Sequence, residues 1–513
     1  MTQLSFYIVS DIHGYIFPTD FSKRNQNLPM GLLKVNQLIE QERQHDDYSF
    51  KIDNGDFLQG SPLCHYLATE EQSSQPLTDI YNRLNFDFGT LGNHEFNYGL
   101  PYLQNTLNHL HHPILCANIF DHNNAPLTGQ GVSYFNRGEI TIGVIGLTTQ
   151  FIPNWEQPAH IKGLTFNSAV ETLKCILPDV RKKSDVVVVS YHGGFEKSLD
   201  TDIPTEELTG ENEGSDILER FHKDIDVLIT GHQHRDIAMI KNDTAIIQPG
   251  TRGTEFGKVT LTLDHEHRIT DKQSTLVSVP SHLSLTLSNN DHSLLNELED
   301  WLDTDITTLS EPMLVTHQFE ARTHPHSLIN LINYILLEKS GAEIASTALF
   351  DSAKGFNQQV TMRDIINNYP FPNTFQVLEL NGKGIKAALE KSASYFSVND
   401  NNEITVSDTF LSPKPQHFNY DMYGGISYTI HAGAPVGQRV SDIKVGASPL
   451  EDTKTYTICV NNYRAVGGGD YKMFAEAPVV KDIQEEGAQV LIDYMTHHDL
   501  SRIPQVVDFK VLI

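Results

Sequence analysis

The sequence predicts an α/β protein in which two domains are joined by a linker helix. In residues 1–265, short apolar runs alternate with helical stretches, a pattern typical of helices packed on parallel or mixed sheets. Residues 266–312 include an acidic stretch with apolar residues at helical spacing, which predicts a helix over 291–304. Helical and strand patterns return over residues 313–513. We therefore expect a first domain over 1–265, a linker over 266–312 and a second domain over 313–513.

The elements of the first domain follow from the positions of these runs. Short apolar runs predict buried strands, and the amphipathic stretches between many of them predict helices. The strands are expected at 4–10, 50–54, 86–91, 113–117, 140–147, 185–191, 226–230, 244–248 and 258–263. The helices are expected at 31–43, 101–110, 167–181 and 215–222.

The second domain shows fewer and shorter patterns. A loop rich in proline and aromatic residues is expected at 367–375, and a run of three glycines lies at 467–469. This run lacks the GxGxxG pattern and its strand–helix–strand setting, so it does not predict a dinucleotide site. Helices are expected at 327–339 and 382–395, and strands at 427–430 and 456–461.

Charge and composition limit the partners of the protein. The 513 residues include 37 Lys and Arg against 65 Asp and Glu, a net charge of −28. A surface this acidic repels the nucleic-acid backbone, so we expect no nucleic-acid polymer as a partner. Small phosphorylated substrates are still compatible with it, because bound metal ions invert the local field. No apolar run approaches the ~20 residues of a membrane span, so we expect no membrane association. The sequence does not define an oligomeric state.

The N-terminal residues and the cysteines favour a cytoplasmic location. Residues 1–10 lack a basic segment and a cleavage site and lead directly into Asp11, so we expect a core strand there and not a signal peptide. The four cysteines form no CxxC pair. Free, mostly buried thiols are therefore the expected state.

Five short segments of the first domain contain residue types found in metal sites. One such segment alone is more often part of a turn, but here each of the five follows a predicted strand. Ligands of α/β sheets bind at the carboxyl ends of strands, so we expect the five segments to meet at one sheet edge. Their candidate metal ligands are Asp11, His13, Asp56, Asn93, His192, His232 and His234.

The number and chemistry of these groups predict two divalent ions. Seven groups are too many for one ion with about four protein ligands. Asp56, in the middle of the series, is the candidate bridge between two ions. Such ions, ~3.5–4 Å apart, stabilise the attacking and leaving oxygens of a displacement at phosphorus. The mixed nitrogen and oxygen set favours Mn, Fe, Zn or Co. His94 has no ligand role in this set and is predicted to be a proton donor.

The five segments resemble the signature of the calcineurin-like metallophosphoesterases, D-x-H, GD, GNH[ED], H and GHxH. The stretches at 54–62 (NGDFLQGSP) and 92–99 (GNHEFNYG) are similar to the bacterial 5′-nucleotidase and 2′,3′-cyclic-nucleotide phosphodiesterase family. In the second domain, 369–373 (YPFPN), 419–428 (NYDMYGGISY) and 461–468 (NNYRAVGG) resemble the nucleotide-binding domain of that family. The resemblance covers nearly the whole chain.

The resemblance implies a four-layer α/β/β/α catalytic domain, a helical linker and an α/β substrate-binding domain that rotates between open and closed forms. Each metal site is implied to have four ligands, with Asp56 shared. The first set would be Asp11, His13, Asp56 and His234, and the second Asp56, Asn93, His192 and His232.

The resemblance also assigns roles to five further residues. His94 would polarise the leaving group or the phosphate. Phe371 and Tyr463 would sandwich the nucleotide base, and Asn373 would contact its edge; the alternative for the two aromatic residues is a place in the core. Asn97 stands where many secreted 5′-nucleotidases have an aspartate that pairs with the catalytic histidine. An asparagine orients the ring but does not stabilise an imidazolium by charge.

Together these features predict a dinuclear metal-dependent phosphohydrolase of small nucleotides, in which a metal-bound hydroxide attacks phosphorus in line. Asn97 favours the cyclic-phosphodiesterase branch of the family, and His234 stands where some members have glutamine. Two alternatives stay open: a phosphatase for another small organophosphate, and a catalytically silent nucleotide sensor. The sequence contains no Walker A, GxSxG or HExxH motif that would favour another chemistry.

Overall fold

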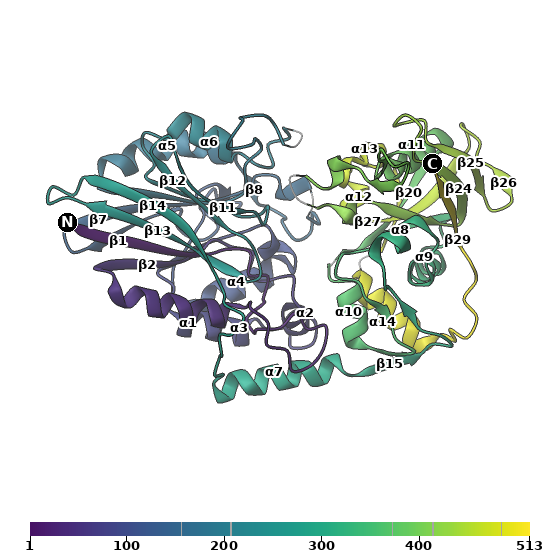
Figure 1. The fold of residues 1–513 in the computed structure, drawn as a ribbon, viewed down its shortest axis with the longest axis horizontal. Helices are drawn as coiled ribbons and strands as arrows, with labels where there is room; N and C mark the ends of the chain where they lie inside the picture. Colours follow the sequence, from purple (N-terminus) through teal and green to yellow (C-terminus); the bar gives the residue numbers. More distant parts are fainter. Residues whose placement is uncertain (155, 206–207, 372, 413–414, 484) are drawn as a thin grey trace. The chain divides into compact units, whose positions relative to one another are not determined.

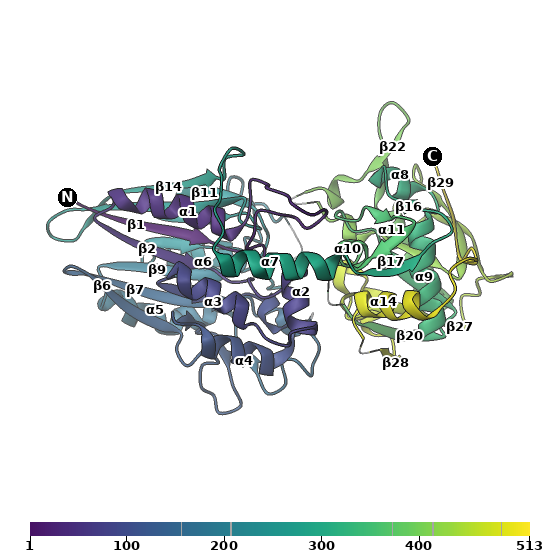
Figure 2. The ribbon, with the colours of Figure 1, turned by 90° about the horizontal axis from the view of Figure 1, so that it is seen from below.

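The computed structural model describes residues 1–154, 156–205, 208–371, 373–412, 415–483 and 485–513. The chain divides into two compact units, Met1–Leu298 and Glu299–Ile513, which are called unit 1 and unit 2 and are described separately. The division falls inside helix α7 (Asn289–Leu302), the helix predicted at 291–304 (Figure 2). Among the described residues, no helix is long and apolar enough to cross a membrane.

Unit 1 contains two six-stranded mixed sheets. In each sheet the central strands are parallel and the edges include antiparallel strands. The order of the first sheet is β14 (Ile269–Ser278), β13 (Glu255–Leu263), β1 (Thr2–Val9), β2 (Tyr48–Asp53), β3 (Phe88–Thr90) and β4 (Ile114–Leu115). The order of the second is β11 (Asp236–Lys241), β12 (Thr244–Pro249), β10 (Val227–Ile229), β9 (Val186–His192), β7 (Ile140–Thr148) and β6 (Val132–Arg137).

Helices cover the outer faces of these sheets, which gives the four α/β/β/α layers implied by the resemblance (Figure 1). Helices α5 and α6 lie on one outer face, and α1 and α3 lie on the other. The helices of unit 1 are α1 (Leu32–Glu42), α2 (Pro62–Thr69), α3 (Gln75–Leu84), α4 (Gly99–His109), α5 (Ala169–Lys182) and α6 (Gly214–Phe221). A small pair of strands, β5 (Ile119–Phe120) and β8 (Thr165–Phe166), completes the unit.

Strand β9 shows why the sequence forms these layers. Its side chains alternate between two cores, as the two-residue period of a strand requires. Val186 and Val188 belong to the core between the sheets, which includes residues of β1, β2, β12 and β13. Val187 and Val189 pack in the core that contains α5 and α6. Because both faces are buried, the strand is a continuous apolar run, and the sequence predicts it correctly.

Strand β14 was not predicted and lies inside the stretch expected to be the start of the linker. It pairs antiparallel with β13 at the edge of the first sheet. Its burial alternates between partly exposed and exposed positions, so it has no apolar run to identify it. The unpredicted edge strand β6 has the same half-exposed character.

Unit 2 has a five-stranded and a four-stranded mixed sheet that share one apolar core with its helices. The first has the order β23 (Asp421–Gly424), β17 (Ile344–Ala348), β27 (Thr455–Asn461), β20 (Phe375–Asn381) and β28 (Val479–Ile483). The second has the order β26 (Ser448–Pro449), β25 (Val440–Val445), β24 (Ile426–His431) and β29 (Val507–Leu512). Three short pairs are β15 (Asp305–Thr308) with β19 (Gln359–Thr361), β16 (Met313–Leu314) with β18 (Gly355–Phe356), and β21 (Phe396–Val398) with β22 (Ile404–Val406).

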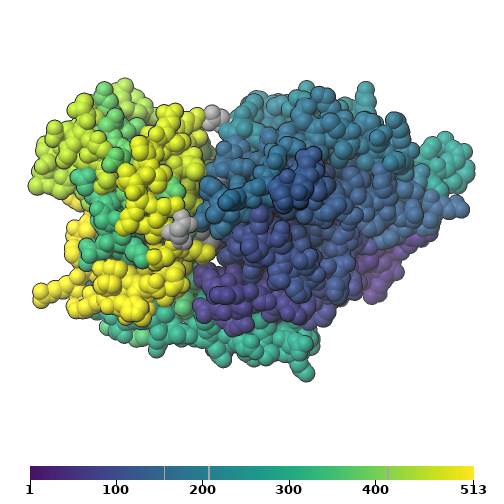
Figure 3. Space-filling view, turned by 180° about the vertical axis from the view of Figure 1, so that it is seen from behind, coloured from purple at the N-terminus to yellow at the C-terminus, as the bar shows by residue number. Residues whose placement is uncertain are grey.

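The helices of unit 2 include the two predicted ones, which are α9 and α11. The helices of this unit are α8 (Gln318–Thr323), α9 (Ser327–Ser340), α10 (Met362–Asn368), α11 (Gly382–Ala393), α12 (Asn462–Ala465), α13 (Lys472–Ala475) and α14 (Gly487–His497). The C-terminal part of the chain, yellow in Figure 3, forms part of the surface of unit 2 on that face.

Arg464 fixes the turn that carries Tyr463 in unit 2. Its side chain is buried, and its guanidinium donates two hydrogen bonds to the equally buried Asp421, from Nε at 3.0 Å and from Nη2 at 3.1 Å. Nη1 also donates to the Gly468 carbonyl at 3.0 Å and to Asn419 Oδ1 at 3.1 Å. The ion pair therefore joins β23 to the segment after β27.

We expect Arg464→Met to destabilise unit 2. The substitution leaves the Asp421 carboxylate buried without its cation, which typically costs about 3–5 kcal/mol. Chemical unfolding of the full chain measures this loss. Asp421→Asn in the same background removes the stranded charge and should recover part of it. Unchanged unfolding of Arg464→Met would contradict the role of the pair.

Candidate metal centre

The predicted ligands lie at the carboxyl ends of five strands, but these strands belong to two sheets and not to one. Asp11, Asp56 and Asn93 follow β1, β2 and β3, which are parallel neighbours in the first sheet. His192 ends β9, and His232 follows β10, its parallel neighbour in the second sheet. The expectation of a single sheet edge is therefore corrected: two facing sheets each supply one edge.

Six of the seven predicted ligands lie, together with His94, in three groups of side chains, and the seventh, Asn93, has its Oδ1 2.8 Å from His232 Nδ1. The ligand atoms within each group lie within 4.8 Å of one another. The groups are Asp11, His13 and His234; His13, Asp56 and His94; and Asp56, His192 and His232. His13 and Asp56 each belong to two of the groups, and Asp56 is the one carboxylate among these groups that does so, as expected for a carboxylate between two ions.

The most buried part of the cluster contains two polar atoms that need a partner. Asp56 Oδ2 and His192 Nε2 lie 3.1 Å apart, and neither atom has any other hydrogen-bond partner within the described residues. Asp11 Oδ1 lies 3.8 Å from the same nitrogen and 3.4 Å from His234 Nε2. Buried polar atoms without partners are costly, and a divalent cation would satisfy both carboxylate and imidazole. The donor set therefore fits the metal ions that the family implies.

Hydrogen bonds on the far side of two rings direct their other nitrogen toward the cluster. Gln59 O lies 2.8 Å from His13 Nδ1, and Asn54 O lies 2.6 Å from His192 Nδ1. A carbonyl accepts only, so each Nδ1 carries the proton and each Nε2 presents its lone pair. His13 Nε2 and His234 Nε2 lie 3.0 Å apart, which is the convergence that a shared ion requires.

His232 has a partner that the sequence did not predict. Its Nδ1 lies 2.8 Å from Asn93 Oδ1, and its Nε2 lies 2.9 Å from Glu211 Oε1. Glu211 precedes α6 in a loop without a motif, so only its position in the fold identifies it. Carboxylates in this position orient ligating imidazoles and increase their basicity.

The backbone of five predicted ligands adopts the left-handed conformation that residues other than glycine rarely adopt. Such a conformation costs of order 1–3 kcal/mol per residue, and several such residues together are a feature of functional sites. The backbone at Gly92 also lies close to the Asp56 side chain, so position 92 has no room for a side chain: a Cβ there would overlap Asp56 Oδ1. The five φ values are 55° for Asp11, 51° for His13, 58° for Asp56, 67° for His232 and 55° for His234.

Glu95 holds the loops of β2 and β3 together and was not predicted. Its buried carboxylate accepts hydrogen bonds from the backbone N–H groups of Asp56, Phe57, Leu58 and Gly92 at 2.5–3.2 Å. It stands within the GNHE segment, so the motif contained the signal. Its role is to shape the backbone that presents Asp56.

The electrostatics of the cluster favour positive charge between Asp56 and His192. Burial alone would lower the pKa of His192, but the carboxylates of Asp56 and Asp11 raise it to about 10. The pKa of His13 is lowered to about 3 by burial and by the neighbouring His234. A site that holds a proton this strongly beside buried carboxylates also attracts a divalent cation.

His94 lies at the edge of this cluster. Its backbone N–H donates to Asp56 Oδ1 at 2.8 Å, and its ring is 5.2 Å from that of His13. Asn97 Oδ1 lies 2.6 Å from His94 Nδ1. The predicted contact between these two side chains is therefore present, and it leaves the other ring nitrogen to act on the cluster side.

The residues predicted to bind the base lie in unit 2. Phe371 is 38% exposed, with its ring 5.2 Å from that of Phe350, so it is not a core residue. Tyr463 lies in α12 and packs closely on the glycine run, since a Cβ on Gly468 would approach the tyrosine ring to 2.5 Å. Asn373 is half-buried. Pro372, between Phe371 and Asn373, lies outside the described residues, and the sandwich of the base stays a prediction.

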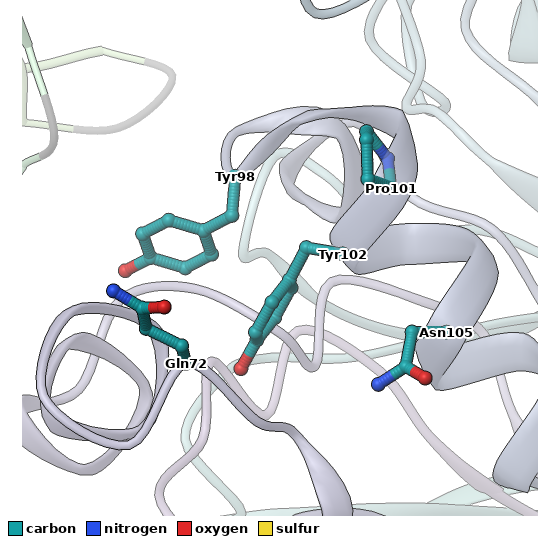
Figure 4. Close-up of a pocket in the computed structure, with 5 residues that line it drawn as sticks. All are labelled: Gln72, Tyr98, Pro101, Tyr102 and Asn105. Carbon is teal, nitrogen blue, oxygen red and sulfur yellow. The ribbon is translucent and has the colours of Figure 1, made fainter.

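A pocket of about 470 Å³ lies beside α4 in unit 1 (Figure 4). None of its lining residues belongs to the metal cluster. The rings of Tyr98 and Tyr102 lie 5.5 Å apart in an edge-on arrangement and point toward Gln72. The lining residues are Gln72, Tyr98, Pro101, Tyr102 and Asn105.

Comparison with known proteins identifies the family. Residues 4–236 match the calcineurin-like phosphoesterase family, and residues 305–476 match the 5′-nucleotidase C-terminal domain. A crystal structure of a candidate 5′-nucleotidase from Staphylococcus aureus, in complex with alpha-ketoglutarate, is 60% identical over 100% of both chains, with a TM-score of 0.97. The chain thus belongs to the calcineurin-like phosphoesterases that carry a 5′-nucleotidase C-terminal domain, a family of hydrolases.

Two relatives with named activities are more distant. The 2′,3′-cyclic-nucleotide 2′-phosphodiesterase/3′-nucleotidase of Salmonella typhimurium is 26% identical over 90% of this chain and 80% of its own length. The trifunctional nucleotide phosphoesterase protein YfkN of Bacillus subtilis is 22% identical over 96% of this chain. The chain spans only 38% of the length of YfkN.

We expect Asp56→Asn to reduce the metal content of the purified protein to well under two ions per chain, because it removes the charge shared by two groups of ligands. Elemental analysis measures this content. Asp243→Asn is the matched control, since that side chain is 91% exposed just before β12, at the opposite end of the sheet from the cluster. Two ions and normal activity in Asp56→Asn would exclude a bridging role.

For His94→Ala we expect the opposite combination of effects. The turnover number should fall on the order of 10²–10⁴-fold, the range for loss of a general acid. The metal content should stay at the wild-type value, because the other groups remain. Since His94 also lies near His13 and Asp56, loss of metal together with activity would show that it is a ligand.

Proposed function

We propose that the protein is a dinuclear metal-dependent phosphohydrolase of nucleotides, with 5′-nucleotidase activity, 2′,3′-cyclic-nucleotide 2′-phosphodiesterase/3′-nucleotidase activity, or both. The position of Asp56 in two ligand groups supports the two-ion chemistry. The 5′-nucleotidase C-terminal domain over 305–476 supports a nucleotide substrate. In this proposal residues 1–265 are catalytic and 313–513 bind the substrate. The linker predicted at 266–312 begins after β14, which belongs to the first sheet.

The ligand sets are those implied by the resemblance. Two ions held there would act as Lewis acids on the phosphoryl oxygens and lower the pKa of the attacking water. The mixed imidazole, carboxylate and amide donors favour Mn, Zn, Fe or Co. One set consists of Asp11, His13, Asp56 and His234, and the other of Asp56, Asn93, His192 and His232.

The protein side chains supply position and protons. Gln59 O and Asn54 O hold His13 and His192 in the tautomer whose Nε2 points inward. His94 Nε2 serves the oxygen that leaves phosphorus, because its Nδ1 is occupied by Asn97. The neutral ring carries its proton on Nδ1, so Nε2 first takes up a proton and then donates it to that oxygen. In the second domain Phe371 and Tyr463 stack on the base and Asn373 contacts its edge.

The two alternative functions would require different features of the protein. A phosphatase for another organophosphate would use the same cluster with a different ligand on the second domain. A silent nucleotide sensor would not need His94 beside a complete set of ligands, so the cluster disfavours it.

The four cysteines are free, three of them buried, which supports the cytoplasmic location that we propose.

A substrate panel tests the proposal. The full chain, loaded in turn with Mn, Zn, Fe or Co, is assayed with 5′-AMP, 2′,3′-cyclic AMP, p-nitrophenyl phosphate and its bis ester. We expect metal-dependent hydrolysis of at least one nucleotide and loss of activity on chelation. Hydrolysis of the nitrophenyl esters alone would favour the other phosphatase, and no hydrolysis would favour the sensor.

Phe371→Ala tests the second domain. Base stacking contributes ~1–3 kcal/mol, so KM for nucleotides should rise roughly 5- to 150-fold. Hydrolysis of p-nitrophenyl phosphate should be almost unchanged, because this ester has no base. Phe319→Ala, which truncates another half-exposed phenylalanine of unit 2, is the control. Equal damage to both substrates would indicate a folding role, and no damage would place the base elsewhere.

A further inference from the structure

Behind His94 a series of hydrogen bonds leads away from the metal cluster. Asn97 Oδ1 lies 2.6 Å from His94 Nδ1, and Asn97 Nδ2 donates to Glu156 Oε2 at 2.6 Å. The other oxygen of Glu156 lies 2.9 Å from His160 Nδ1. Neither Glu156 nor His160 belongs to the recognised motifs, and both follow the short helical turn after β7.

Glu156 is surrounded by hydrogen-bonding nitrogen atoms. Its side chain is only 6% exposed. It receives N–H groups at both oxygens, from Asn97 at Oε2 and from the Gln157 backbone at Oε1 at 2.8 Å. With His160 this makes three nitrogen partners for one carboxylate. A carboxylate in this environment accepts hydrogen bonds and donates none.

The direction of these bonds decides the proton position on His94. An asparagine side chain has one accepting and one donating end, and Glu156 can pair only with the donating end. The carbonyl end of Asn97 must therefore face His94. That carbonyl accepts a proton from Nδ1, which leaves Nε2 as the nitrogen that acts on the substrate side.

We propose that Glu156 is a positioning residue that acts through Asn97 to hold His94 in the Nδ1-protonated tautomer. This inference rests on the proposed function and extends it. Where many secreted 5′-nucleotidases pair the histidine directly with an aspartate, this chain places an amide between the ring and the carboxylate. Asn97 alone has no preferred orientation, and Glu156 supplies it.

The first test compares turnover numbers and metal content in zinc-loaded full-length variants, with p-nitrophenyl phosphate as substrate. Glu156→Ala frees the Asn97 amide to rotate, so kcat should fall roughly 10- to 100-fold, the usual effect of losing an orienting partner. KM and the zinc content should be unchanged. Gln157→Ala is the control, because Gln157 contributes its backbone N–H, which alanine retains.

A charge exchange separates positioning from a purely structural role. In Glu156→Gln the new amide can accept or donate, so Asn97 loses its fixed direction and kcat should fall. Adding Asn97→Asp should raise kcat again. The carboxylate introduced at position 97 accepts a hydrogen bond from His94 Nδ1, and the amide introduced at position 156 donates one to that carboxylate. If the second substitution lowers kcat further, Glu156 only supports the loop and the proposal is wrong.

A spectroscopic measurement keeps the test independent of the substrate. In protein labelled with ¹⁵N-histidine, the His94 signals are assigned by their loss in His94→Gln. Wild type should show the Nδ1-protonated tautomer, and Glu156→Ala should show a mixture or the other form. An unchanged tautomer would overturn the proposal even if the enzyme hydrolyses nucleotides. Conversely, a changed tautomer without nucleotide hydrolysis would support the positioning role and contradict the proposed substrate.

Discussion

The carboxylate of Asp56 is the group on which the arrangement of unit 1 depends. It is buried, it lies 3.1 Å from His192 Nε2, and it belongs to two groups of metal-binding side chains. A buried negative charge is costly unless it is paired, and here its near partners are the His192 imidazole and the backbone N–H of His94. The surrounding backbone positions this carboxylate. Glu95 accepts a hydrogen bond from the backbone N–H of Asp56, and the absence of a side chain at Gly92 leaves room for the Asp56 oxygen.

The second domain has a different organising interaction. Arg464 and Asp421 form a buried ion pair that joins β23 to the segment carrying Tyr463. Replacing such a pair with apolar groups is often neutral for stability, so its value here lies in fixing the local geometry. Phe371, by contrast, is half-exposed in a loop. One predicted partner of the base thus stands beside a buried ion pair, and the other is half-exposed with its ring against Phe350.

Strands and site residues are predicted correctly from the sequence where a short stretch of residues contains the whole signal. The parallel strands of unit 1 are buried on both faces, so each is an apolar run, and each predicted ligand follows one of them. Edge strands such as β14 and β6 are half-exposed and have no such signal. The same limit applies to the site. Its seven predicted ligands lie in recognisable motifs, whereas Glu211 and Glu156 reach it from loops whose position depends on the whole fold.

The two sheets of unit 1 supply different members of the ligand set. The distance between ligands of the first and of the second sheet therefore depends on how the two sheets pack on each other. Asp11, Asp56 and Asn93 move with the first sheet, and His192 and His232 move with the second. The apolar layer between the sheets, which includes side chains such as Ile8 and Val188, sets how far apart the two edges lie, together with hydrogen bonds that cross between the edges, such as that of His192 Nδ1 to Asn54 O. A change of side-chain volume in that layer, away from any polar atom of the site, would therefore act on the distances between ligands that the two sheets supply.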